Sequence, residues 1–124
     1  MNKISFIVGQ EWSYKTRENE KESTYIITKI DDKNNKQNII HIYIKNLKMK
    51  NALSQTGFND HIVHLPFDYN SLKECTLDLK TQHQTLPDFK EGYLEWIKMF
   101  ESGKAGVFKI PLSDAINYLE HHFN

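Results

Sequence analysis

The stretch NIIHIYIK at residues 38–45 decides the fold of this 124-residue chain because it is the strongest strand pattern in the sequence. Alternate residues of a strand point to opposite faces of a sheet, and β-branched and aromatic residues favour strands. His41 and Tyr43 therefore share one face. The other face carries three isoleucines, which are Ile40, Ile42 and Ile44. We expect the isoleucine face to lie beneath helices and the face of His41 and Tyr43 to be exposed.

Three further strands are predicted on either side of this stretch. Their residues are 11–16 (EWSYKT), 23–30 (STYIITKI) and 61–65 (HIVHL). Pro66 should end the last of them, because proline cannot donate a hydrogen bond to a strand ladder. Polar segments connect these strands, and one of them, at 31–37, is predicted to be a hairpin loop. This order is typical of an antiparallel meander.

The second half of the chain changes to helical periodicity. Ser71 and Glu74 have the spacing of a capping box, which predicts a short helix to about Leu79. Residues 85–88 (TLPD) open a longer helix that Gly103 should end. Its apolar stripe, at a spacing of three and four residues, consists of Phe89, Tyr93, Trp96, Ile97 and Phe100.

A strand at 106–110 and a helix from about Ser113 complete the predicted elements. The apolar face of this last helix consists of Leu112, Ala115, Ile116, Leu119 and Phe123. Strands first and helices later indicate an α+β fold, with a mainly antiparallel sheet of about five strands and two to three helices packed on one face. Residues 1–124 are expected to form a single domain.

Composition excludes several classes of protein. The chain has 16 basic and 16 acidic residues, no formal net charge and one cysteine. Proteins that bind nucleic acid or a membrane surface rely on clustered positive charge, so we expect neither partner. A single cysteine forms no intrachain disulfide, and neither a signal peptide nor an apolar run of about 20 residues is found. We therefore expect a cytoplasmic protein.

The histidines and the cysteine lack the spacing of a reactive or metal site. His61 and His64 are three apart on a predicted strand, which places them on opposite faces and argues against a shared metal ion. Cys75 falls on the apolar face of a predicted helix and is expected in the core. No metal and no cofactor are predicted.

Five aromatic or polar residues form the candidate binding site. They are Tyr14, Arg17, Glu20, His41 and Tyr43. The first three lie near the first turn, and the last two lie on the face of the 38–45 strand that is expected to be exposed. Such a surface, carrying the only arginine of the chain, is typical of protein recognition. The alternative is an ordinary solvated face with an Arg17–Glu20 ion pair worth under ~1 kcal/mol.

Four segments resemble a family of small uncharacterised bacterial proteins of about this length. They are residues 11–24 (EWSYKTRENEKEST), 39–51 (IIHIYIKNLKMKN), 64–67 (HLPF) and 86–110 (LPDFKEGYLEWIKMFESGKAGVFKI). The resemblance extends from Gly9 to the last helix and implies no particular activity. Packing or turn formation explains most of the matching positions. It does not explain three of them, which are Arg17, Glu20 and His41. The other matching positions are Trp12, Tyr14, Pro66, Gly92, Tyr93, Trp96, Gly103, Gly106 and Phe108.

These features favour a small protein-binding module without catalysis of its own, such as an immunity-type inhibitor that masks a toxin or effector. The expected partner is another protein, and the chain itself is expected to be a monomer or a weak homodimer. The alternative is a small enzyme or anionic-ligand-binding protein in which Arg17 holds an anion and His41 acts as a general acid or base. That alternative requires Arg17, Glu20 and His41 to converge in one pocket. Self-association through an exposed edge strand is a third possibility.

Overall fold

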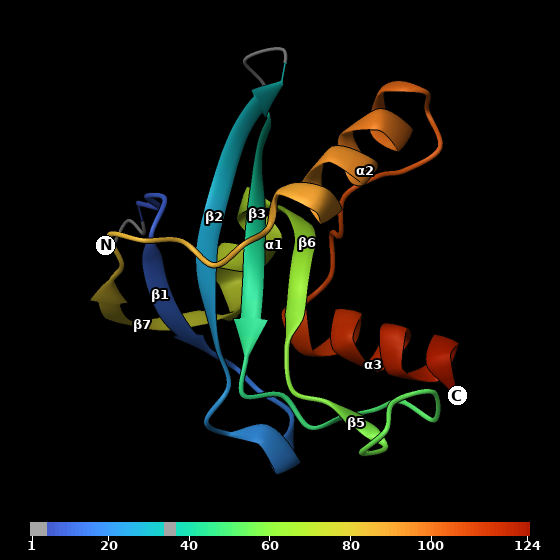
Figure 1. The fold of residues 1–124 in the computed structure, drawn as a ribbon. Coiled ribbons are helices and arrows are strands. Elements are labelled where there is room, and N and C mark those ends of the chain that lie inside the picture. Colours follow the sequence, from blue (N-terminus) through green and yellow to red (C-terminus); the bar gives the residue numbers. More distant parts are fainter. Residues whose placement is uncertain (1–4, 34–36) are drawn as a thin grey trace.

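An antiparallel sheet built around residues 38–45 forms the centre of the molecule. The computed structural model describes residues 5–33 and 37–124, and its five-stranded sheet has the order β6-β3-β2-β1-β7 (Figure 1). These strands are β1 (Gln10–Tyr14), β2 (Thr24–Lys33), β3 (Gln37–Lys45), β6 (Ile62–Asp68) and β7 (Thr76–Gln82). Residues 34–36 of the predicted 31–37 loop lie outside the described residues, and residues 31–33 belong to β2.

The remaining elements surround this sheet. A separate two-stranded hairpin pairs β4 (Met49–Lys50) with β5 (Phe58–Asn59), and η1 (Glu18–Glu20) is a short 3-10 helix. The α-helices are α1 (Tyr69–Cys75), α2 (Lys90–Glu101) and α3 (Leu112–Phe123). The α+β class and the antiparallel meander through β1, β2, β3 and β6 are thereby confirmed.

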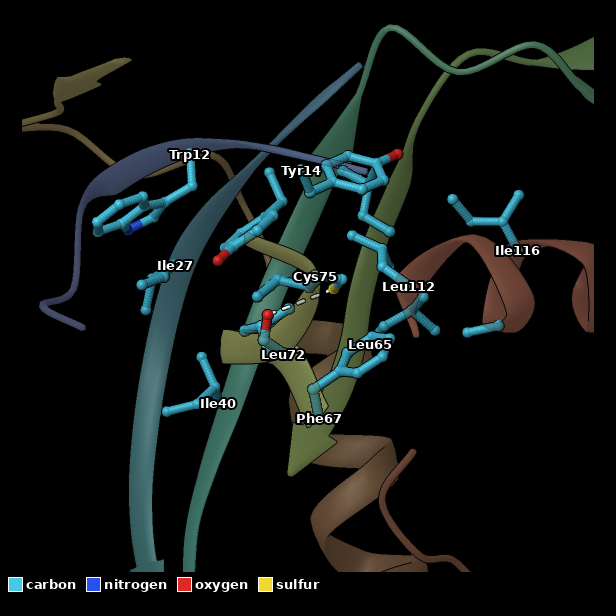
Figure 2. Close-up of a cluster of buried hydrophobic side chains, with 14 of the residues drawn as sticks. Trp12, Tyr14, Ile27, Ile40, Leu65, Phe67, Leu72, Cys75, Leu112 and Ile116 are labelled. Atoms are coloured by element: carbon cyan, nitrogen blue, oxygen red, sulfur yellow. Dashed lines mark hydrogen bonds between the residues drawn. The ribbon is translucent and has the colours of Figure 1, made fainter. Parts of the chain in front are cut away.

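The isoleucine face of β3 carries the main hydrophobic core, as predicted. Figure 2 shows Ile40 of this face in one cluster of buried side chains with Leu72 and Cys75 of α1 and with Leu112 and Ile116 of α3. Ile42 and Ile44 belong to the same cluster. The core residues contributed by β3 are Ile40, Ile42 and Ile44, all of which are fully buried. Removing this apolar surface from water is the main stabilising contribution to the fold.

The opposite face of β3 is also covered, contrary to the prediction. His41 is completely buried, and the Tyr93 and Trp96 rings of α2 contact its imidazole edge-on, with ring centroids 4.9 Å away in each case. The helices are therefore distributed over both faces, with α1 and α3 on the isoleucine face and α2 on the histidine side. The sequence pattern misleads here because a strand covered on both sides can keep polar residues if each finds a hydrogen-bond partner.

The segment from Pro66 to Gln82 departs from the prediction most. Strand β6 continues through Pro66, whose carbonyl accepts a hydrogen bond from Phe108 on the outer side of the strand. The missing proline N–H therefore points away from the ladder with β3 and costs no bond there. The Asp68 side chain, rather than Ser71, caps α1 by accepting the Ser71 N–H at 3.2 Å.

Strand β7 begins where the sequence predicts that the first helix continues. Thr76 pairs with Tyr14 of β1, and its hydroxyl lies 2.7 Å from that of Tyr25. Leu79, where the predicted helix was to end, is instead a half-exposed residue of β7 at the edge of the sheet. Pairing with β1 has overridden the local helical pattern, an effect that local propensity does not reveal.

The last two helices are largely as predicted. Helix α2 begins at Lys90, later than the pattern at 85–88 indicated, and none of its residues is fully buried. Gly103, with a φ of 78°, ends it in the left-handed conformation that glycine tolerates best. The 106–110 strand is reduced to a single bridge between Phe108 and Phe67. Three members of the predicted α3 face are fully buried, namely Leu112, Ala115 and Ile116, whereas the side chain of Phe123 lies outside the described residues. Within the described ranges, no helix is long and apolar enough to cross a membrane.

Candidate functional site

A chain of hydrogen-bonded titratable side chains lies between α2 and the sheet. The Oδ2 atom of Asp31, on β2, is 2.9 Å from Nε2 of His41, and Nδ1 of His41 is 2.8 Å from Nε2 of His64, on β6. The hydroxyl of Tyr93, from α2, donates to the same Asp31 oxygen at 2.8 Å. Lys29 approaches the other Asp31 oxygen at 3.4 Å. These hydrogen bonds thus link β2, β3 and β6 and connect α2 to them.

The environment shifts the pKa values of this cluster. Burial, with His41 as a smaller contribution, lowers the pKa of His64 to about 4, so His64 is neutral at pH 7. Burial alone would raise the pKa of Asp31, but hydrogen bonds from Tyr93 and His41 outweigh it, and the pKa falls below its ordinary value. Burial and the nearby Asp31 raise the pKa of Tyr93 to about 12. Asp31 is therefore a charged carboxylate, and it is the first of the three hydrogen-bonded side chains Asp31, His41 and His64.

The ionised Asp31 also determines which imidazole nitrogens carry protons. A carboxylate can only accept, so Nε2 of His41 must donate to it. The Nδ1 atom of His41 and the Nε2 atom of His64 share one proton across their 2.8 Å hydrogen bond. The Nδ1 atom of His64 has no hydrogen-bond partner among the described residues. Since no buried side-chain nitrogen or oxygen of those residues lacks a partner, this atom is in contact with solvent.

Such an arrangement has a definite chemical capacity. A carboxylate that orients one imidazole, and through it a second one, fixes the orientation of both rings. A proton can pass between the two imidazoles along their hydrogen bond, and a positive charge on His41 is stabilised by the neighbouring Asp31.

His61 lies on the same side of the sheet as His64, contrary to the prediction. Strand β6 has a register shift between the pairs Ile42–Leu65 and Ile44–Ile62, so it contains one more residue than β3 over this stretch. Such an extra residue interrupts the strict alternation of side chains. Positions 61 and 64 consequently behave like neighbours on one face.

Ring contacts confirm this placement. The His61 ring stacks on Tyr43, with centroids 5.7 Å apart and planes 17° apart, and the His64 ring stacks on His41 at 5.0 Å and 18°. Tyr43 and His41 lie on the same face of β3. The rings of His61 and His64, which stack on them, therefore lie on that same side of the sheet. We call the four side chains His41, Tyr43, His61 and His64 the histidine face.

Arg17 and Glu20 form a second, separate cluster. The guanidinium makes two parallel hydrogen bonds to the Glu20 carboxylate, from Nε and Nη2, each 2.8 Å long. Its Nη1 atom also donates to Asn117 at 3.1 Å and to Glu120 at 2.9 Å, both on α3. The hydrogen bonds to Glu20 and Glu120 raise the pKa of Arg17. This arginine therefore fastens the first turn to α3 rather than facing a ligand.

The five predicted binding residues do not form one exposed surface. Glu20, His41 and Tyr14 are buried, and the Tyr14 hydroxyl lies 2.7 Å from the Ser23 hydroxyl in the interior. Tyr43 is partly covered by His61. The hypothesis of a recognition surface made of these residues is therefore wrong, because α2, α3 and the strand edges enclose them. The pocket in which Arg17 and His41 were to act together is likewise not formed, since the two belong to different clusters.

An exposed aromatic surface that the sequence reasoning missed lies beside α3. Gly106, Val107, Phe108 and Tyr118 line a hollow of about 290 Å³. The Tyr118 ring is 6.4 Å from that of Phe108, in an edge-to-face arrangement, and 61% of the residue is exposed. The available signal was the position of Tyr118, an aromatic residue outside the apolar stripe of its helix.

Comparison with family models, curated proteins and solved structures finds no match for the chain. The resemblance to a bacterial family therefore stays a prediction. Among residues 5–33 and 37–124, no group of three or more His, Cys, Asp or Glu side chains could hold a metal ion.

Proposed function

We propose that the protein is a small protein-binding module whose partner docks on the hollow beside Tyr118. The observation that carries this proposal is the exposure of a large aromatic side chain at the border of an apolar hollow. Tyrosine offers a large contact area with few rotatable bonds, and it is enriched among the residues that dominate binding energy. An isolated exposed tyrosine is ordinary, but one that forms the wall of a hollow provides a shape into which a partner side chain can fit.

The surroundings of the hollow support the same proposal. Ile110 is 38% exposed, and Val107 and Phe108 are partly exposed, so the apolar surface extends beyond Tyr118. Lys109 and Asp114 are exposed in the same stretch of chain. An apolar centre with a polar, two-signed rim is the usual composition of a protein interface.

The specific form that we propose is an immunity-type inhibitor that masks a toxin or effector. Equal numbers of acidic and basic residues give a surface of mixed sign, and complementary charges on a partner would then supply rapid and specific association. The chain would act by covering its partner, without chemistry of its own.

The test is affinity capture from the source cells followed by mass spectrometry, with the chain and two variants as baits. Tyr118→Asp places a charge at the hollow, whereas Leu77→Asp changes a residue that is 50% exposed at the β7 edge of the sheet (Figure 1). We expect one protein to be captured by the parent and by Leu77→Asp, and at least tenfold less of it by Tyr118→Asp. Circular dichroism verifies that both variants are folded. Equal capture by all three baits, or capture of no specific protein, contradicts the proposal.

A further inference from the structure

The segment 84–106, which contains α2, is anchored to the rest of the chain immediately before and after it. Before it, the His83 N–H donates to the Gly9 carbonyl at 2.7 Å, and Nε2 of His83 lies 2.6 Å from the Glu11 carboxylate. After it, Phe108 makes two backbone hydrogen bonds to β6, each 3.0 Å long. Figure 1 shows the segment crossing the sheet on its way to α2. We call residues 84–106 the cover.

Contacts within the cover hold it together. Nε1 of Trp96 donates to the Gly106 carbonyl at 2.9 Å, so the chain that follows α2 is bonded back to the helix. The Trp96 ring stacks on the Phe100 ring with centroids 4.7 Å apart, and the Lys104 N–H donates to the Met99 carbonyl at 2.8 Å. None of these contacts involves the sheet, so all of them can persist when the cover moves away from the sheet as one unit.

The cover buries less of itself than the other helices do. All of residues 84–106 are described, and none of them is fully buried. By contrast, α1 buries Leu72 completely in the core, and α3 buries Leu112 and Ile116. Burial of apolar surface is the main stabilising contribution, so separating the cover from the sheet costs less free energy than unfolding the sheet with α1 and α3.

The side chains beneath the cover are polar. Tyr93 donates to Asp31 at 2.8 Å, and the Tyr93 and Trp96 rings contact the His41 imidazole edge-on. The ammonium group of Lys29 lies 5.3 Å from the centre of the Tyr93 ring. Hydrogen bonds and ring contacts of this kind contribute about 1 kcal/mol each, because water replaces them when they break. The cover is therefore fastened by a few contacts of modest strength.

From these contacts we propose that the cover opens as a unit while the sheet, α1 and α3 stay folded, and that it thereby controls access to His41 and His64. With the cover closed, His41 is completely buried and no molecule in solution can reach it. With the cover open, the hydrogen-bonded side chains Asp31, His41 and His64 face solvent on an intact sheet. Proteins open locally in contiguous units of this kind. The opening is a property of the chain alone, so it does not rest on the partner proposed above.

The first experiment is native-state hydrogen exchange of the full chain, followed amide by amide in NMR spectra. We expect the α2 amides to exchange at least 100-fold faster than the slowest amides of β2 and β3. Tyr93→Phe removes a contact that opening breaks, so it should accelerate α2 exchange about 5–30-fold. The matched control, Ile116→Val, changes only the core. It should accelerate the slowest strand amides about 2–10-fold and leave α2 exchange unchanged. The proposal is overturned if α2 exchanges as slowly as β3, or if Ile116→Val accelerates both equally.

The second experiment closes the cover with a disulfide. A Cβ built at Gly92 lies 3.1 Å from the Cβ of His64, so a small shift allows Gly92→Cys and His64→Cys to be joined. In the oxidised double variant, modification of His41 by diethyl pyrocarbonate should be at least tenfold slower than in the reduced form of the same variant, which serves as the control. Peptide mass spectrometry identifies the modified histidine. Equal rates in the two forms, or failure of the disulfide to form, contradict the proposal.

Discussion

Replacing Arg17 by methionine tests whether the Arg17–Glu20 cluster is a buried structural ion pair. Methionine keeps an apolar stem of similar length and removes the guanidinium. The exposed fractions of the two side chains are 11% for Arg17 and 0% for Glu20, so the Glu20 carboxylate would lose its counter-charge inside the protein. Its remaining bond would be the one from the Lys48 backbone N–H, which is 3.0 Å long.

The expected cost follows from these contacts. Each hydrogen bond to a charged group contributes about 1.5–3 kcal/mol, and removing one partner of a buried ion pair costs about 3–5 kcal/mol. Because Arg17 lies close to the surface, water can partly replace it, and we expect a loss of about 3 kcal/mol in the free energy of unfolding. For a chain of this size that corresponds to a fall of about 12 °C in Tm.

The assay is urea unfolding followed by the fluorescence of Trp12 and Trp96. The control is Lys21→Met, because Lys21 and Glu18 form an ion pair of the same spacing in the same turn, 3.6 Å long but with side chains 73% and 95% exposed. Such an exposed pair contributes less than about 1 kcal/mol, so Lys21→Met should unfold almost like the parent. A second comparison uses Glu20→Gln in the Arg17→Met background, which removes the unpaired charge and should restore about 1 kcal/mol. The reasoning fails if Arg17→Met and Lys21→Met cost the same, or if the added Glu20→Gln destabilises the protein further.

Two other substitutions test the contacts that position α2 and the β1–β7 edge. Tyr93→Phe removes the 2.8 Å hydrogen bond to Asp31 and should cost about 1–2 kcal/mol, whereas Tyr118→Phe, at an exposed ring, should cost less than about 0.5 kcal/mol. Burial and Asp31 raise the pKa of Tyr93 to about 12, so the stability that this phenol contributes is present below pH 10 and is lost as the pH rises toward 12. The difference in the free energy of unfolding between Tyr93→Phe and the parent, measured by urea titration, should therefore decrease between pH 10 and pH 12. A difference that stays constant over this range would argue against the hydrogen bond between Tyr93 and Asp31. Gly9→Ala should destabilise the chain more than Gly57→Ala, as measured by thermal unfolding. Both glycines have positive φ, but a Cβ at Gly9 would lie 2.5 Å from the His83 carbonyl oxygen, and one at Gly57 would meet nothing within 4 Å. Equal losses for the two variants would show that the close approach between β1 and the end of β7 is absent.

The sequence by itself determined the central strand, its isoleucine core face and the last helix. These features depend on local periodicity: alternating isoleucines must be buried together, and an apolar stripe at helical spacing must face a core. The class of fold followed from the order of such segments, and Ile40, Ile42 and Ile116 lie where that reasoning placed them.

Tertiary structure alone decided where the polar residues went. His41 is buried because Asp31, His64 and an approaching helix supply its hydrogen bonds and covering rings, and these partners are 10, 23 and more than 50 residues away in the chain. An extra residue in β6 brought His61 to the side of His64, and pairing with β1 turned a predicted helical segment into β7. No local pattern encodes these outcomes, because the free energy of burying a polar group depends on partners that only the folded chain brings together.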